Sequence, residues 1–442
     1  MQSWLRLPLI LHLVAFGLPA SLAQAEVDDF PPELDDLRMN EVQLIGSHNS
    51  YHIQPDAVLD SVMVLVLADA PVALDGLCPG ETVADNCVQR LRYTHPSLDV
   101  QLGEMGIRQF ELDVFAEPLG FGMQENLYQY PFGWHFFLPE YPALPGMPFD
   151  PALAEDGFKV FHVQDIDFRS TCYTLVACLT TIRDWSLANP RHIPILVLIE
   201  VKDDLLPEVV VETPPIGVIP WAVPEPFSAR MFGLLEAEIR SVFGEDHLLT
   251  PDDVRGGYET LREAVLSEGW PTLLEASGKV YFALDNGGSY LATYLSPRPS
   301  LAGAVMFTSS PPEAAEAAFM KRNDPYDPEI PGLVADGFLV RTRADVETQE
   351  AIANDTARRD QAFASGAHFV STDYRDPDLL LSPYQVAFEG DTTFRCNPIN
   401  TMEGCSFAVP EPQLALLEGV ALLALAWVRQ RSRTAARLGA AG

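Results

Sequence analysis

Hydrophobic and polar positions alternate with a period of two along residues 107–115, which read IRQFELDVF. Phe110, Leu112 and Val114 fall on one side, whereas Glu111 and Asp113 share the other. This alternation predicts a β-strand with one apolar face and one face that carries two carboxylates. Two neighbouring carboxylates repel each other unless a cation lies between them. The stretch therefore indicates either an edge strand with both acids in water or a site for a hard cation such as Ca²⁺ or Mg²⁺.

Further apolar runs along the chain have the length and composition of strands. Together with the first, the expected strands are residues 42–47, 108–114, 159–164, 194–201, 279–285, 303–308, 337–343 and 368–373. Apolar residues at three- and four-residue spacing predict helices at 172–188, 229–243, 312–322 and 346–365. Eight strands that alternate with helical crossovers predict an α/β fold, a single catalytic domain built as a (β/α)8 TIM-like barrel.

Residues 116–157 break this alternation. The segment is rich in proline, glycine and aromatic residues and reads NLYQYPFGWHFFLPEYPALPGMPF in its central part. This composition does not fit a helix. It predicts a long loop after the second strand, lying over the mouth of the barrel or along its side as an ordered arm.

The N-terminal residues have the pattern of an export signal. Arg6 precedes a mostly apolar run at 7–22, and Ala23-Gln24-Ala25 forms a small-x-small cleavage site. The chain has 28 Lys+Arg against 62 Asp+Glu, a formal net charge of −34. So acidic a protein is not expected to bind nucleic acid or to dock broadly on anionic lipid.

Six cysteines occur as three pairs of near neighbours in the sequence. No pair has the spacing of a zinc knuckle, and no histidine lies at ligand spacing, so zinc is the weaker alternative. In an exported chain the pattern predicts three local disulfides. The expected pairs are Cys78–Cys87, Cys172–Cys178 and Cys396–Cys405.

The C-terminal residues carry a second targeting pattern. A Val-Pro-Glu-Pro box at 409–412 is followed by a mostly apolar stretch at 413–428 and then by Arg429, Arg431 and Arg433. The stretch is short for a membrane span, which needs about 20 residues. The layout resembles the PEP-CTERM sorting tail of Gram-negative bacteria, which implies processing by an exosortase-type enzyme at the cell envelope. A plain C-terminal membrane anchor is the alternative.

Candidate chemistry falls at or near the ends of the expected strands. His48 and Asn49 follow the first strand, and the third carries His162. Glu200 and Lys202 share one face of the fourth, otherwise apolar strand. Because active sites of such barrels lie at the carboxyl ends of the strands, these side chains are expected to meet the acids of the second strand. A buried core histidine is the alternative for either His taken alone.

An ordered set of short motifs runs through the chain. They are SHNSYH at 47–52, ELD at 111–113, FHVQD at 161–165, IEVK at 199–202, FALDN at 282–286, VRTRAD at 340–345 and STDY at 371–374. Together they resemble the Ca²⁺-dependent phosphatidylinositol-specific phospholipases C, particularly the secreted bacterial single-domain branch. The resemblance covers residues 43–374. Together with the two targeting patterns, it divides the chain into a signal peptide (1–25), a phosphodiesterase barrel (26–408) and a sorting tail (409–442).

The resemblance implies a role for each motif residue. Asn49, Glu111, Asp113 and Glu200 would hold Ca²⁺, and His48 and His162 would act as catalytic residues beside the phosphate. Lys202, Asp285, Arg341 and Asp373 would bind substrate. The implied reaction is attack by the inositol 2-hydroxyl on the phosphorus of a phosphoinositide lipid at a membrane surface, giving cyclic inositol phosphate and diacylglycerol. Two histidines that titrate near neutrality suit the required proton transfers.

Two other functions remain open from the sequence. A glycerophosphodiester phosphodiesterase uses a similar E-x-D pair and two histidines with water as the nucleophile, but normally has His-Arg where this chain has His48-Asn49. The chain has no membrane-targeting domain and no basic patch, so a soluble inositol phosphodiester is a possible substrate. A catalytically silent envelope barrel that binds lipid or carbohydrate is the third reading, which the complete set of histidines and acids disfavours.

Overall fold

The computed structural model describes most of the chain between residues 29 and 407. The described residues are 29–68, 74, 78, 80–116, 151–164, 166–208, 210–211, 217–218, 221, 223–346, 348–401 and 405–407. The predicted signal peptide at 1–25, the predicted tail at 409–442 and most of the predicted loop at 116–157 lie outside these residues.

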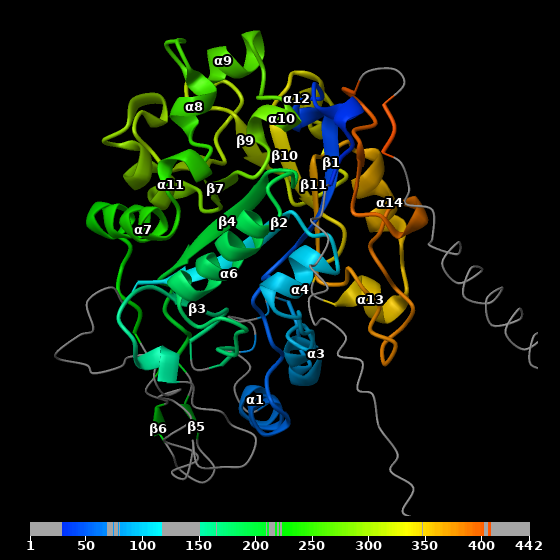
Figure 1. Ribbon diagram of the computed structural model, residues 1–442. Coiled ribbons are helices and arrows are strands. Elements are labelled where there is room, and N and C mark those ends of the chain that lie inside the picture. The colour runs from blue at the N-terminus through cyan, green and yellow to red at the C-terminus, as the bar shows by residue number, and fades with distance from the viewer. Residues whose placement is uncertain are drawn as a thin grey trace, which may run out of the picture.

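Parallel strands form the centre of the molecule, and helices surround them (Figure 1). In chain order the parallel strands are β1 (Val42–Ser47), β2 (Gln109–Phe115), β4 (Ile195–Lys202), β7 (Val280–Leu284), β8 (Met306–Thr308), β9 (Phe319–Lys321), β10 (Leu339–Arg343) and β11 (Phe369–Thr372). They form two arcs, β2–β4–β7–β8 and β9–β10–β11–β1. A bridge between Ser309 and Phe319 joins the arcs at β8 and β9. The predicted α/β class with a TIM-barrel type of fold is confirmed.

One side-chain and one backbone hydrogen bond connect the arcs at their other junction, between β1 and β2. Nε2 of Gln109 donates to the carbonyl of Ser47 at 3.3 Å, and the backbone N–H of Ser50 donates to the carbonyl of Glu111 at 3.0 Å. The Gln109 side chain fits because Gly46 lacks a Cβ, which would lie 1.9 Å from Oε1 of Gln109. This junction brings the turn after β1 beside the acidic face of β2.

Amphipathic helices cover the outside of the strands. Side-chain caps begin several of them; for example, Thr174 accepts from the N–H of Ala177 and Ser228 accepts from the N–H of Met231. The helices are α1 (Ala57–Ala68), α3 (Ala84–Gln89), α4 (Leu98–Gly103), α6 (Leu175–Ala188), α7 (Ala229–Val242), α8 (Pro251–Arg255), α9 (Leu261–Ser267), α10 (Leu273–Ala276), α11 (Gly288–Leu295), α12 (Ile330–Ala335), α13 (Gln349–Ala353) and α14 (Ala357–Ala364). Short strands β3 (Lys159–Val160), β5 (Val210–Val211), β6 (Gly217–Val218) and β12 (Phe394–Cys396) complete the elements outside the barrel.

Three predicted elements are wrong in part. Of the strand expected at 159–164, only β3 forms, and it pairs antiparallel with β2 instead of joining the barrel. The helix expected at 312–322 is instead a series of turns followed by β9. Ala317 and Ala318, which precede β9, and Phe319 and Met320 within it are all buried. The helix expected at 346–365 divides into α13 and α14 because Asn354 adopts a left-handed φ of 50°.

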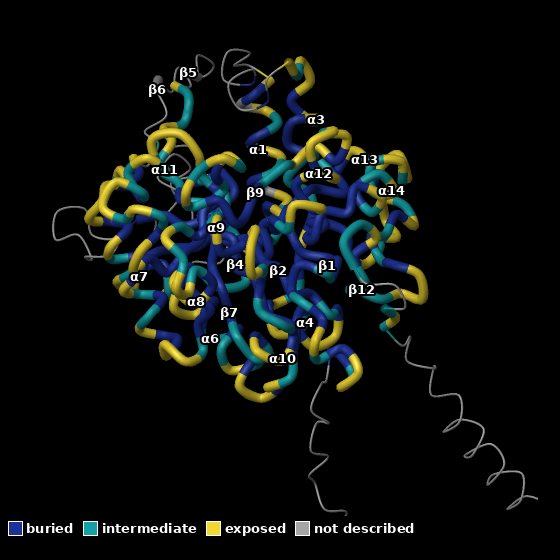
Figure 2. The backbone as a smooth tube through the Cα atoms, turned by 90° about the horizontal axis from the view of Figure 1, so that it is seen from above, coloured by how far each residue is buried: buried dark blue, intermediate teal, exposed yellow. Residues whose placement is uncertain are grey.

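The main apolar core lies inside and around the barrel, where the central strands are buried along their length (Figure 2). A second cluster, which we call the α1–α3 cluster, lies beside the carboxyl ends of β1 and β2. Its members include Leu59, Met63, Leu67, Cys78, Cys87, Val88, Phe115, Phe161, Ile166 and Phe168. It packs α1 and α3 against the segment that follows β3, which positions one wall of the site described below.

The three predicted disulfides, Cys78–Cys87, Cys172–Cys178 and Cys396–Cys405, are confirmed. Cys78–Cys87 lies within the α1–α3 cluster, and Cys396–Cys405 fixes the end of β12. No helix within the described part of the chain is long and apolar enough to cross a membrane.

Candidate active site

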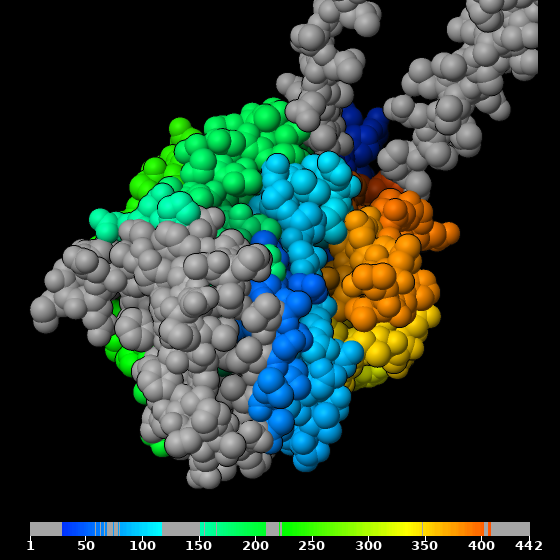
Figure 3. All heavy atoms as spheres, turned by 90° about the horizontal axis from the view of Figure 1, so that it is seen from below, coloured from blue at the N-terminus to red at the C-terminus, as the bar shows by residue number. Residues whose placement is uncertain are grey.

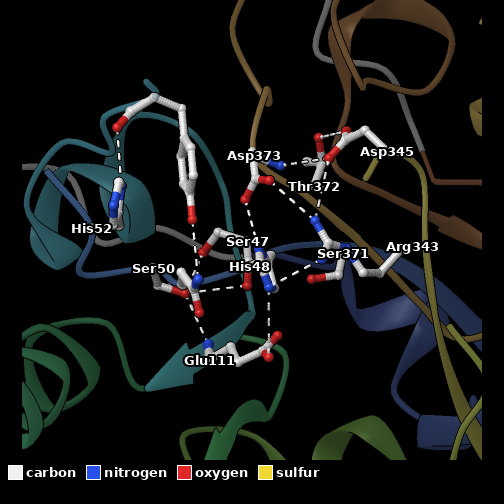
Figure 4. Close-up of polar contacts among 12 residues, drawn as sticks. Ser47, His48, Ser50, His52, Glu111, Arg343, Asp345, Ser371, Thr372 and Asp373 are labelled. Atoms are coloured by element: carbon white, nitrogen blue, oxygen red, sulfur yellow. Dashed lines mark hydrogen bonds and ion pairs between the residues drawn. The ribbon is translucent and has the colours of Figure 1, made fainter. Parts of the chain in front are cut away.

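His48 follows β1 directly and lies between a carboxylate and a guanidinium (Figure 4). Its Nδ1 lies 2.8 Å from Oδ1 of Asp373, and its Nε2 lies 3.1 Å from Nη1 of Arg343. A guanidinium can only donate and an ionised carboxylate can only accept, so Nδ1 carries the proton and Nε2 holds the lone pair. Burial and the charge of Arg343 lower the pKa of His48 to about 3, although Asp373 raises it. The ring is therefore neutral near pH 7 and presents a proton acceptor at Nε2.

Asp373 is ionised because His48 and Arg343 lower its pKa by more than burial raises it. Burial raises the pKa of Asp373, but His48 and Arg343 hold it well below its usual range. Nη2 of Arg343 lies 3.1 Å from Oδ2 of Asp373, so one guanidinium contacts both the carboxylate and the imidazole. The three side chains form a closed triangle that fixes the orientation and the tautomer of His48.

His162 lies in the loop after β3 and contacts a second buried carboxylate. Its Nδ1 lies 2.7 Å from Oδ2 of Asp167, and Nε2 of His52 lies 2.7 Å from the same oxygen. Burial raises the pKa of Asp167, but the two histidines outweigh burial and bring it to about 2. Both predicted catalytic histidines are thus held through Nδ1 by an ionised aspartate, which leaves Nε2 of each ring for chemistry.

The predicted metal-binding acids lie together on β2 and β4. Glu111, Asp113 and Glu200 each offer one oxygen atom, and these atoms lie within 4.8 Å of one another. Parallel pairing places Asp113 directly opposite Glu200. Nζ of Lys202 lies 3.1 Å from Oδ2 of Asp113 and 3.0 Å from Oε1 of Glu200, so an ammonium offsets part of their charge.

Burial makes this acidic cluster electrostatically unfavourable without a cation. Burial raises the pKa of Glu111 to about 7, although Arg341 lowers it. Burial also raises the pKa of Asp113 well above its usual value, with Lys202 acting in the opposite direction. For Glu200, burial raises the pKa, but Lys202 outweighs it and the net shift is downward. A divalent cation would favour the ionised form of all three.

The residues present fit an oxygen-coordinated cation such as Ca²⁺. Oδ1 of Asn49 and Oδ1 of Asp113 are buried and have no hydrogen-bond donor among the described residues. Nδ2 of Asn49 donates to the hydroxyl of Tyr93 at 3.0 Å, which fixes the side chain. Asn49 has a left-handed φ of 43°, a conformation that asparagine tolerates, and Ser50 next to it is hydrogen-bonded to Glu111 on β2. Asn49 is thus held beside the acids with its oxygen unpaired.

The predicted substrate-binding residues occupy different environments. Lys202 is partly exposed beside the acids, and Asp285 forms an ion pair with Lys321 at the end of β7. Arg341 is buried and contacts Glu111, Asn323 and Ser371. Asp373 is also buried, and its carboxylate faces His48 and Arg343.

Three residues of the site were given no role from the sequence: His52, Asp167 and Arg343. Arg343 lies within the VRTRAD motif and His52 within SHNSYH, so the motifs marked these two positions. The motifs did not indicate which residues Arg343 and His52 contact. His52 and Asp167 are separated by 115 residues, and His48 and Arg343 by 295. Only the folded chain shows that Arg343 contacts Asp373 and that His52 contacts Asp167.

The two histidines open into one cavity of about 340 Å³. His48, Asn49, His162, Arg343 and Asp373 line its polar end. A ligand in this cavity would lie beside both histidines, and Nε2 of His48 is a fixed acceptor. The geometry suits acid–base chemistry on a bound ester, beside a carboxylate cluster that can hold a cation.

Comparisons with known proteins agree with this chemistry. The family model described as "Phosphoinositide phospholipase C, Ca²⁺-dependent" matches residues 37–398. No curated protein shows a significant match in sequence.

Solved structures of several bacterial enzymes are similar to the chain. A calcium-dependent phosphoinositol-specific phospholipase C from Pseudomonas sp is 17% identical, with 84% of this chain and 98% of that chain covered and a TM-score of 0.45. A Ca²⁺-dependent phosphatidylinositol-specific phospholipase C from Streptomyces antibioticus is 17% identical, with 76% and 94% covered and a TM-score of 0.41. A phosphatidylinositol-specific phospholipase C from Listeria monocytogenes is 11% identical, with 76% and 89% covered and a TM-score of 0.37.

Proposed function

Because the chain belongs to the Ca²⁺-dependent phosphoinositide phospholipase C family, we propose that it cleaves phosphatidylinositol, or a related inositol phosphodiester, by attack of the inositol 2-hydroxyl on phosphorus. The first products are a cyclic inositol phosphate and diacylglycerol. The observation that carries this proposal is the pair of aspartate-held histidines, His48 and His162, facing one cavity beside a buried carboxylate cluster.

His48 accepts the proton of the attacking hydroxyl. Its Nε2 carries the lone pair because Nδ1–H donates to Asp373 and Arg343 donates to Nε2. The hydroxyl displaces Arg343 as the partner of Nε2, and the proton moves to Nε2 as the new P–O bond forms. The imidazolium that results is stabilised by the ionised Asp373.

His162 donates a proton to the departing glycerol oxygen. With Nδ1–H bonded to Asp167, the proton to be transferred would lie on Nε2, and His162 lines the cavity. As the old P–O bond breaks, this proton moves to the leaving oxygen and diacylglycerol departs neutral. His48 then returns its proton to solvent and His162 regains one, so the cycle balances.

Asn49, Glu111, Asp113 and Glu200 are the residues that would hold Ca²⁺. When bound, the ion supplies positive charge for the phosphate oxygen and the attacking hydroxyl. Lys202 contacts Asp113 and Glu200, and we propose that its ammonium also contacts phosphate or an inositol hydroxyl. Asp285, with Lys321, and Arg341 are proposed to shape the inositol side of the site, and Asp373 to orient His48.

We also propose that the enzyme works outside the cytoplasm of a Gram-negative bacterium. The support is the export-signal pattern at 1–25, the three disulfides and the PEP-CTERM-like tail at 409–442. In this proposal residues 26–408 form the catalytic domain. An exosortase-type enzyme would process the tail at the cell envelope, where the barrel would meet its lipid substrate transiently.

Incubation of the purified protein with phosphatidylinositol in H₂¹⁸O, with and without Ca²⁺, tests the proposal. The expected first product is cyclic inositol phosphate without ¹⁸O, formed only when Ca²⁺ is present. A first-formed product that contains ¹⁸O would show attack by water and would favour a glycerophosphodiester phosphodiesterase.

A further inference from the structure

His52 faces two hydrogen-bond acceptors although it is fully buried. Its Nδ1 lies 3.0 Å from the carbonyl oxygen of Tyr93, and its Nε2 lies 2.7 Å from Oδ2 of Asp167. The pKa of Asp167 is about 2, so its carboxylate is ionised and can only accept, as can a carbonyl. A neutral imidazole has one N–H and cannot satisfy both partners. The position between His52 and Asp167 therefore holds a cation, which is either a proton on Nε2 or a metal ion in place of that proton.

Further ligand atoms for a metal ion surround this position. Nδ1 of His162 lies 2.7 Å from the same oxygen of Asp167, and one ligand atom of each of the three side chains lies within 4.8 Å of the other two. The rings of His52 and His162 meet edge to face, with their centroids 5.9 Å apart. Oδ1 of Asp167 is buried and has no hydrogen-bond partner among the described residues. Two imidazole nitrogens and one carboxylate suit Zn²⁺, whereas Ca²⁺ prefers oxygen ligands.

The cavity at the two catalytic histidines gives access to this position. His162 lines the cavity with 23% of its side chain exposed, whereas His52 and Asp167 are fully buried. The helices α1 and α3 contribute other lining residues and lie beside each other, blue and cyan, on the face shown in Figure 3. The acids of β2 and β4 form a separate group of ligand atoms. An ion at His52 and His162 would thus be distinct from the Ca²⁺ of the proposed reaction.

We propose that His52, His162 and Asp167 form a second metal site, for Zn²⁺ or a similar transition-metal ion, and that a bound ion switches off acid catalysis by His162. In the form of the enzyme that is ready to donate, His162 is an imidazolium. The ion replaces the proton on Nε2 of His52 and the proton on Nδ1 of His162, and both protons leave to solvent, so the total charge of the cluster is unchanged. His162 keeps its proton on Nε2 but becomes a neutral ring, which releases its last proton far less readily than an imidazolium. The inhibition rests on the proposed function, whereas the metal site does not.

Metal binding to the purified protein tests the site directly. Saturating Ca²⁺ is present throughout, so that the acids of β2 and β4 are occupied. Isothermal titration calorimetry should then show one Zn²⁺ bound per chain, and Co²⁺ at the same site should give the intense visible absorption of four-coordinate Co²⁺. His52→Gln, whose amide can still donate to Asp167, should weaken Zn²⁺ binding at least tenfold and abolish this absorption. His162→Gln, at a partly exposed position, should have the same effect and serves as the second variant if His52→Gln does not fold.

His247→Gln is the matched control, because His247 is a partly exposed histidine that contacts Ser186 and no residue of the cluster. It should leave Zn²⁺ affinity and the Co²⁺ spectrum unchanged. Absence of Zn²⁺ and Co²⁺ binding in the presence of Ca²⁺, binding that Ca²⁺ displaces in competition, or binding that neither His52→Gln nor His162→Gln weakens would each overturn the site.

Kinetics test the effect on catalysis. With Ca²⁺ saturating, Zn²⁺ should lower kcat on phosphatidylinositol at least tenfold and have little effect on an aryl phosphoinositol, whose leaving group departs without a proton. Equal inhibition of both substrates would overturn the loss of the general acid as the cause. If neither substrate is cleaved in Ca²⁺ alone, the proposed reaction is wrong, and a Co²⁺ spectrum that is lost on His52→Gln still supports the metal site.

Discussion

Nε2 of His52 lies 2.7 Å from Oδ2 of Asp167, the oxygen atom that also accepts the hydrogen bond of His162. His52 is fully buried, its ring stacks on Tyr93, and its Nδ1 lies 3.0 Å from the carbonyl oxygen of Tyr93. Both ring nitrogens are therefore engaged, and the ring cannot turn without losing two hydrogen bonds. His52 therefore holds the carboxylate of Asp167 in place, and Asp167 in turn fixes the direction in which Nε2 of His162 points.

Replacing Asp167 with Asn tests this arrangement. The amide keeps the shape of the carboxylate but removes its negative charge and can turn its NH₂ group toward His162, so Nε2 of His162 should be less firmly oriented and proton donation should weaken. We expect kcat on phosphatidylinositol to fall by roughly 10² to 10³, within the usual contribution of a general acid. Asp156→Asn, at an exposed position in the same region, is the matched control. An Asp167→Asn enzyme with wild-type kcat would contradict the arrangement.

Ca²⁺ should stabilise the folded protein as well as activate it. Its binding relieves the repulsion among buried carboxylates and pairs the orphaned oxygens of Asn49 and Asp113. A ligand at about 100 times its Kd adds roughly 2.7 kcal/mol to the free energy of unfolding. Differential scanning calorimetry should therefore show a higher Tm in millimolar Ca²⁺ than in chelator.

Asp113→Asn should reduce this Ca²⁺-dependent shift in Tm and raise the Ca²⁺ concentration needed for activity by at least about tenfold. Glu245→Gln, a change of an exposed carboxylate far along the chain, should leave both properties unchanged. Full activity in excess chelator, or activation by Zn²⁺ in place of Ca²⁺, would exclude the proposed oxygen-ligand site.

His368 should make the free energy of unfolding depend on pH. Nε2 of His368 lies 2.7 Å from the carbonyl oxygen of Asn40, and its Nδ1 accepts from the N–H of Val340 at 3.1 Å, so only the neutral ring satisfies both partners. Burial lowers the pKa of His368 to about 4, although the bond to Asn40 raises it. Between pH 6.5 and 4 the unfolded chain binds this proton and the folded chain does not, so stability falls as pH falls.

The contribution of His368 over that window is about 3 kcal/mol, from a difference of roughly 2.5 pKa units. Urea denaturation at several pH values measures it. His368→Gln should be less stable than the wild type near pH 8, and its stability should fall less steeply between pH 6.5 and 4. Because the other titrating groups are common to both proteins, parallel curves would show that His368 is not the source.

Much of the barrel is predictable from local sequence, because β2 alternates with a period of two and β4 is a mostly apolar run that ends in charged residues. The parallel strand β9 was missed, since its three residues follow Pro311 and Pro312 in a segment whose apolar spacing also suits a helix. The acids of the site were predictable from the period of two on β2, and their cluster with Glu200 is found as expected. The contacts of Arg343 with His48 and of His52 with Asp167 join elements that are distant in the sequence, and no local pattern specifies them.

The division of labour between His48 and His162 provides the most direct test of the mechanism. His48, with its lone pair fixed at Nε2 beside Asn49, should activate the nucleophile, which every substrate requires. His162 protonates the leaving oxygen, which an activated aryl leaving group does not need. His162→Ala should therefore lose more kcat/KM on phosphatidylinositol than on an aryl phosphoinositol, and the two losses should differ by a factor of about 10² or more. His48→Ala should lose similar factors on both substrates.

If His162→Ala loses the same factor on both substrates, His162 is not the general acid, and its bond to Asp167 then serves to position the substrate or the fold. If instead His48→Ala is the variant that the aryl substrate rescues, the two roles are exchanged, because only the residue that protonates the leaving oxygen becomes dispensable when that oxygen departs as a stable anion.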